Sequence, residues 1–269
     1  MKHILSTLLS VVIGLGWSYT TSAEEQKQAL SPEAKGLEIA VEAQRRDNGF
    51  IGASSSFTMI LRDSQGNERP RHMRSRTMEV KDDGDKSMII FDNPGDVKGT
   101  TFLSYTHKQG ADDQWLYLPA LGKVKRISSR NKAGSFMNSE FAFEDIASQE
   151  VEKYTYKYLK DATHEGISVF VLELDPTDEK SGYSKIHSYI DQQRYIPLKI
   201  DFFDRAGQRK KTLLFTDYRQ YKDKFWRASN QLMQNHLTGK STLLKSKDWV
   251  FGLPYTDKDF NKNSLARAK

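Results

Sequence analysis

The residues best able to do chemistry, the histidines and the acids, are spaced in a way that indicates no catalytic or metal site. No two histidines lie three or four residues apart, so no helix face carries a ligand pair; they are His3, His72, His107, His164, His187 and His236. The chain has no cysteine, which excludes a thiol nucleophile, a disulfide and a Cys-ligated zinc. We therefore expect no catalytic residue, no metal and no cofactor.

Two pairs of neighbouring aspartates offer a possible acid and base. Asp82-Asp83 and Asp112-Asp113 could in principle serve a glycosidase-like reaction, which needs two carboxyl groups. Both pairs fall where turns are expected, and aspartate is favoured in turns because it hydrogen-bonds locally. The turn interpretation is the stronger one, and an enzyme acting on lipid or glycan is the least favoured function.

A stretch that joins an apolar, aromatic strand to a basic strand is the first indication of binding. It runs from Gln114 to Ile127, with the turn at residues 119–122. The apolar half could form a cavity wall and the basic half a cationic rim for an anionic head group. A core strand beside a charged edge strand explains the pattern equally well. The cavity candidates are Trp115, Leu116 and Tyr117, and the rim or partner candidates are Lys123, Lys125 and Arg126.

A second stretch, residues 134–145, places large apolar side chains after a flexible Gly-Ser start. It could be a mobile segment that covers a lipid-sized cavity, since methionine suits irregular apolar surfaces. Ordinary core packing beneath a loop is the favoured alternative, because apolar residues usually face a core. The candidates here are Phe136, Met137, Phe141 and Phe143.

One long helix and many short strands must position these residues. Residues 32–47 are predicted to be helical, with Ser31 as the cap, Pro32 at the first position and Gly49 beyond the end. After Gly49 the apolar period changes to two, which predicts roughly eleven or twelve antiparallel strands arranged as a meander or barrel. Residues 139–147 lack this alternation and are predicted to form a second helical piece.

Composition and the first residues indicate a protein outside the cytoplasm. The formal net charge is only +6 and arises from 41 basic and 35 acidic residues, a mixture that argues against nucleic-acid binding. Residues 1–23 read as a cleaved signal peptide, with Lys2, a short apolar run and a small-residue site ending at Ala23. We expect a periplasmic protein that is soluble after cleavage, with one domain over residues 24–256 and a polar, frayed tail over residues 257–269.

Several longer motifs resemble those of a known family. They are Phe91–Thr100 (FDNPGDVKGT), Trp115–Leu121 (WLYLPAL), Lys125–Ile127 (KRI), Gly134–Met137 (GSFM), Phe141 and Glu144-Asp145. The chain resembles the LolA-like outer-membrane lipoprotein-sorting protein family, in particular the branch found with RND/MMPL-type inner-membrane transporters. The resemblance extends from about Gly36 to Ser246. Asn138 and Glu140 depart from it, because Gly and Asp are usual there.

The resemblance implies a fold and a function. The fold would be mainly β: an unclosed, strongly curved antiparallel β-barrel with an α-helical lid. The function would be that of a carrier or chaperone that shields the acyl chains of a lipid or lipoprotein and works with an inner-membrane transporter. A regulatory protein that senses a lipid or lipoprotein is the alternative, although it would need an interaction domain after Tyr255.

The resemblance also raises the question of the arginine that locks the lid in the best-known carrier. No single arginine of this chain matches a family motif for that role. We expect Arg71, Arg74 and Arg76 to form a solvated or rim-facing row along one strand.

Overall fold

Helix α1 (Pro32–Asp47) begins and ends where the sequence predicts in this computed structural model, which describes residues 30–268. The Ser31 side chain accepts a hydrogen bond from the Ala34 amide at 3.1 Å, and Pro32 occupies the first turn. Arg45 and Arg46 lie in the last turn, where basic side chains interact favourably with the helix dipole.

The rest of the chain forms mainly one antiparallel sheet of 13 strands. The strands are β1 (Gly52–Arg62), β2 (Glu68–Met78), β3 (Lys86–Asn93), β4 (Thr101–Tyr105), β5 (Asp113–Leu118), β6 (Lys123–Ile127), β7 (Tyr154–His164), β8 (Ile167–Pro176), β9 (Tyr183–Asp191), β10 (Pro197–Asp204), β11 (Arg209–Tyr221), β12 (Phe225–Asn235) and β13 (Ser241–Phe251). Their order in the sheet is β6-β5-β4-β3-β2-β1-β13-β12-β11-β10-β9-β8-β7. The edge strands β6 and β7 do not pair, so the predicted unclosed, curved barrel is confirmed.

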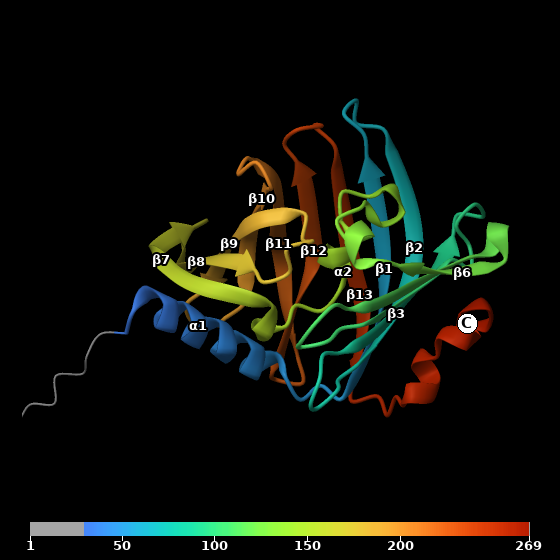
Figure 1. Cartoon of the computed structure of the whole chain (residues 1–269), viewed down its shortest axis with the longest axis horizontal. Coiled ribbons are helices and arrows are strands. Elements are labelled where there is room, and N and C mark those ends of the chain that lie inside the picture. The colour runs from blue at the N-terminus through green and yellow to red at the C-terminus, as the bar shows by residue number, and fades with distance from the viewer. Residues whose placement is uncertain (1–29, 269) are drawn as a thin grey trace, which may run out of the picture.

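The connection between the two edge strands runs through the inside of the curve (Figure 1). It carries η2 (Ser129–Asn131), η3 (Phe136–Asn138), α2 (Phe143–Ile146) and η4 (Val151–Lys153). The predicted helical piece is thus only one turn long. Ser139 does not cap it, because its hydroxyl donates to the Phe136 carbonyl at 2.7 Å, and the Asp145 carboxylate instead accepts from the Ala142 amide at 2.7 Å.

The C-terminal segment differs from the predicted frayed tail. It forms η5 (Asp257–Phe260) and η6 (Lys262–Arg267), which lie against the outer face of the sheet (Figure 1). Phe260 and Leu265 are fully buried there against Met88, Leu103 and Trp115. These two apolar side chains help to attach an otherwise polar segment, because each buries a large apolar surface.

The signal-peptide prediction falls on residues outside the described range. Across residues 30–268, helices long and apolar enough for a membrane span are absent.

Candidate functional site

A cavity of about 850 Å³ lies between helix α1 and the concave face of the sheet. This volume falls in the range of about 300–1,000 Å³ that small-molecule sites occupy. The cavity has an apolar wall formed by alternate residues of strands β7 to β11, which period two directs to the inside. These residues are Tyr156, Leu172, Leu174, Ile190, Ile200 and Phe215.

Helix α1 can cover this cavity because it packs closely against strand β7. Gly36 is the point of contact: a Cβ atom there would lie 2.8 Å from the backbone nitrogen of Tyr158. The Lys35 ammonium lies 3.5 Å from the centre of the Tyr158 ring, and the Arg46 guanidinium lies 4.1 Å from the centre of the Tyr195 ring. The helix is thus held at both ends, with Ala40 and Gln44 facing the cavity.

Two acids, the half-buried Asp85 and the buried Glu150, line the cavity. Burial, together with the nearby Glu150 carboxylate, raises the pKa of Asp85 to about 7. Burial also raises the pKa of Glu150, whose carboxylate accepts a hydrogen bond from the Gln44 amide at 3.1 Å. The cavity lining therefore combines an apolar wall with an acid, Asp85, whose charge changes near neutral pH.

The other half of the barrel interior is filled by residues 134–146, which we call the plug. Phe136 and Phe143 pack edge to face, with ring centres 5.5 Å apart, and both contact Phe102 of strand β4. Phe141 is buried in the same cluster, and Met137 packs at its border. Asn138 has φ = 60°, a left-handed conformation that asparagine tolerates better than most residues.

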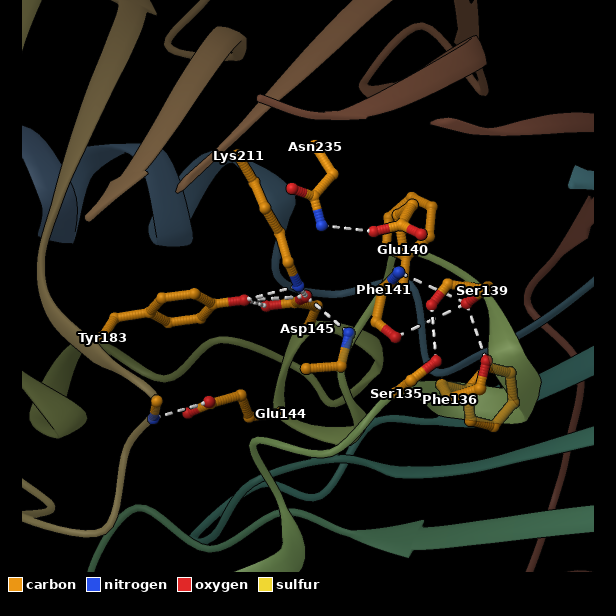
Figure 2. A network of polar contacts seen from close by, with 12 residues as sticks. Ser135, Phe136, Ser139, Glu140, Phe141, Glu144, Asp145, Tyr183, Lys211 and Asn235 are labelled. Atoms are coloured by element: carbon orange, nitrogen blue, oxygen red, sulfur yellow. Dashed lines mark hydrogen bonds and ion pairs between the residues drawn. The ribbon is translucent and has the colours of Figure 1, made fainter. Parts of the chain in front are cut away.

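A buried polar network attaches the plug to the barrel wall (Figure 2). The Tyr183 hydroxyl donates to Asp145, with oxygen distances of 2.8 and 3.0 Å, and the Lys211 ammonium lies 3.5 Å from the same carboxylate. The side chains of Lys211 and Asp145 are only 7% and 3% exposed. Burial and the neighbouring carboxylates raise the pKa of Tyr183 well above its usual value, so it stays a neutral donor.

Glu144 and Glu140 add further attachments on either side of this network. The Glu144 carboxylate accepts from the Gly182 amide and the Ser181 hydroxyl, both at 2.9 Å. The Glu140 carboxylate accepts from the Asn235 amide at 2.6 Å, and its backbone amide donates to Thr242 at 2.9 Å. Glu140 therefore joins the plug to strands β12 and β13.

The arginines of strand β2 do not form one row. Arg71 lies on the inner face and donates from Nη1 to the carbonyl of Met137 in the plug. Arg74 and Arg76 lie on the outer face, since period two separates odd from even positions. Arg74 pairs with Asp92 at 2.9 Å, and Arg76 reaches the Met88 sulfur at 3.0 Å. The expectation of a common solvated row is wrong for this reason.

The structure separates the residues that the sequence singles out. None of the seven cavity candidates lines the 850 Å³ cavity. Leu116 and three plug residues lie in the inner core, whereas Trp115 and Tyr117 face the opposite side of strand β5, towards η6. The rim candidates lie on the exposed edge strand β6, where Arg126 pairs with Asp113. A ligand-binding role for these residues stays a prediction.

The cavity-lining residues were visible in the sequence only as strand alternation. Leu172, Leu174 and Ile200 belong to runs with a clear period of two, which marks one face but does not tell a filled interior from a hollow one. Nowhere in residues 30–268 do three or more His, Asp or Glu side chains gather in a way that could hold a metal ion.

Comparisons with known proteins agree with this architecture. A family model described as an uncharacterized protein matches residues 83–267. A structure from Vibrio parahaemolyticus, provisionally described as an outer membrane lipoprotein-sorting protein domain, is 53% identical; the match covers 87% of this chain and 99% of that one, with a TM-score of 0.85. A DUF1329 family protein from Desulfovibrio piger is 25% identical, with a TM-score of 0.83 over 88% of this chain and 100% of that one.

A more distant structure identifies the fold. A LolA superfamily protein from Nitrosomonas europaea is 18% identical, with a TM-score of 0.69 over 87% of this chain and 99% of that one. A search of curated proteins gave no match. The unclosed barrel, its helical cover and the 53% identity over most of the chain together show that this protein belongs to the LolA-like family of outer-membrane lipoprotein-sorting proteins.

Proposed function

We propose that the protein is a periplasmic carrier that shields the acyl chains of a lipid or lipoprotein during transfer to or from the outer membrane. The observation that carries this proposal is the apolar cavity beneath helix α1, in a chain 53% identical to a domain described as lipoprotein-sorting. Each methylene moved from water into such a cavity contributes about 0.8 kcal/mol. About ten methylenes would then supply the ~8 kcal/mol that corresponds to micromolar affinity.

The plug gives the carrier a second, larger state. In the described structure the Phe136, Phe141 and Phe143 side chains fill the space that a longer or additional acyl chain would need. Displacing the plug would join that space to the cavity and would turn these aromatic residues into cargo contacts. Cargo binds and leaves in this scheme without chemical turnover.

The cargo test is native mass spectrometry of the processed protein from a periplasmic extract, followed by organic extraction of what it holds. We expect a bound acyl species, and its loss in a Leu174→Asp variant, which places a charge on the cavity wall. Val250→Asp, at a residue that is 48% exposed, is the matched control and should keep the ligand. A protein that stays empty after incubation with native lipids and lipoproteins would exclude the carrier function.

We propose an inner-membrane transporter of the RND/MMPL type as the partner. The supporting feature is the exposed basic strand β6, which carries Lys123, Lys125 and Arg126. A Lys125→Glu/Arg126→Glu variant should lose co-purification with the transporter while its melting temperature changes little, because exposed ion pairs contribute about 0–1 kcal/mol. Unchanged co-purification of a folded variant would exclude this surface.

A further inference from the structure

A second pocket lies on the outer face of the sheet, apart from the cavity beneath α1. It has a volume of about 210 Å³ and is lined by Ser54, Ser55, Ser56, Arg74, Ser75, Arg76, Met88, Ile90, Asp248 and Tyr255. This volume is several times the ~30 Å³ that a water molecule occupies in the liquid. Hydroxyl groups and guanidinium groups dominate the polar part of the lining.

The strand register brings these groups together on one face. Ser54 lies opposite Arg76 and Ser56 lies opposite Arg74 in the pairing of β1 with β2. Residues opposite one another on an antiparallel pair are direct neighbours. Each arginine is therefore placed beside a serine hydroxyl, and within residues 30–268 the hydroxyls of Ser54 and Ser56 make no hydrogen bond to another residue.

Arg76 lacks the partner that a half-buried arginine usually has. Its Nε atom is buried and bonds to no atom of the described residues, and its Nη2 atom donates to the Met88 sulfur, which is a weak acceptor. In residues 30–268 no carboxylate lies within ion-pair distance of it. An unsatisfied guanidinium in a pocket is costly unless an anion or water occupies the site.

Of the two guanidinium groups at this pocket, that of Arg76 is the one without an ion-pair partner in residues 30–268. Arg74 is engaged by Asp92 at 2.9 Å, and Asp248 lies 3.6 Å from Lys247. The carboxylate of Asp259, also close to Arg76, accepts hydrogen bonds from the amide and hydroxyl of Thr256 at 2.8 and 3.0 Å. Among the residues that line the pocket, Arg74 and Arg76 are basic and Asp248 is acidic, so the lining carries one positive charge in excess beside several hydroxyl groups.

We propose that this outer pocket binds a phosphate-type oxyanion, held by the Arg76 guanidinium and the hydroxyls of Ser54 and Ser56. The planar guanidinium matches two oxygens of such an anion, and the hydroxyls can reach the others. The phosphate can be free in solution or part of a lipid head group, and both present the same group to the pocket.

The test is isothermal titration of the processed protein with inorganic phosphate at constant ionic strength. We expect saturable binding with one site, and an affinity at least about tenfold weaker in Arg76→Gln, because hydrogen bonds to charged groups are the stronger ones. Arg69→Gln removes the same charge from an exposed position on the same strand and should bind like the unchanged protein. A double Ser54→Ala/Ser56→Ala variant, which keeps Arg76, should weaken binding several-fold and serves if Arg76→Gln does not fold.

The possible outcomes decide whether the pocket binds phosphate and from which source the phosphate comes. Absence of saturable binding at millimolar phosphate, or equal binding by a folded Arg76→Gln variant and the unchanged protein, would overturn the proposal. A water-soluble, short-chain phosphatidic acid is the second probe. Tighter binding of that lipid than of phosphate, again lost in Arg76→Gln, would identify a lipid head group as the source, whereas equal binding would identify free phosphate.

Discussion

The Nη1 atom of Arg71 donates a hydrogen bond to the backbone carbonyl of Met137, so a strand of the barrel holds the segment that fills its interior. Met137 has φ = 50°, a left-handed conformation that few residues adopt without support. Arg71 therefore links the wall of the barrel to the position of the plug.

Arg71→Leu should loosen the plug. We expect faster amide hydrogen exchange over residues 134–146 and a loss of about 1–3 kcal/mol in the free energy of unfolding, because a charge-assisted hydrogen bond is removed. Arg74→Leu, which breaks only an exposed ion pair on the outer face, should cost less than about 1 kcal/mol and leave the exchange unchanged. Equal exchange rates in Arg71→Leu and the unchanged protein would show that the contact does not hold the plug.

Asp145→Asn should destabilise the fold strongly. The change leaves the Lys211 ammonium buried without a countercharge, and removing one partner of a buried ion pair costs about 3–5 kcal/mol. Urea unfolding followed by circular dichroism measures this loss. Asp92→Asn, which removes the partner of Arg74 at the surface, is the control and should change stability by less than about 1 kcal/mol. A loss as small as the control's would mean that the buried pair is not charged.

Asp85 should make the protein less stable as pH rises. Its pKa is raised from 3.8 to about 7 by burial and by Glu150, so the folded state binds a proton that the unfolded state releases between those values. The contribution of Asp85 to the free energy of unfolding is fully present below about pH 4 and is lost as pH rises towards about 7. Asp85→Asn should flatten this part of the stability profile, whereas Asp82→Asn in the same loop should not. Parallel profiles for both variants would contradict the assignment.

Gly36→Ala should lower stability although it favours the helical backbone. Alanine is normally better than glycine in a helix by about 1 kcal/mol. Here the added Cβ atom would approach the backbone of β7 to 2.8 Å, so helix α1 must move away from the cavity that it covers. A lower melting temperature and faster exchange over residues 32–47 are expected, with Glu38→Ala on the exposed side as the control. A rise in melting temperature would show that the helix can shift at no cost.

The elements could be predicted from the sequence more fully than their arrangement. Local signals set the limits of the helix at residues 32–47, and period two identified the apolar strands. The face of the sheet to which a side chain points could also be predicted in part. Trp115 and Tyr117 alternate with Leu116 along one strand, so these three side chains cannot all line one cavity. The Asp145–Lys211 pair could not be found in this way, since its members are brought together only by the curvature of the sheet.

The C-terminal segment shows the same limit. Its composition is polar, and the apolar side chains of Met88 and Trp115 on the outer face, which this segment covers, give Phe260 a place to bind. The strand count was slightly low, since about eleven or twelve strands were expected and 13 form.

The pairing of β1 with β13 sets when the sheet can be completed. Ile60 lies opposite Leu243, so the centre of the sheet joins the first strand made to the last. Until the last strand is available, β1 keeps one edge without a partner, and strands β1 to β6 stay separate from strands β7 to β12. A chain that is still emerging from a ribosome or passing through a membrane channel therefore cannot form the β1–β13 pairing. Its sheet stays incomplete, and the chain stays able to pass through a channel, until strand β13 is available.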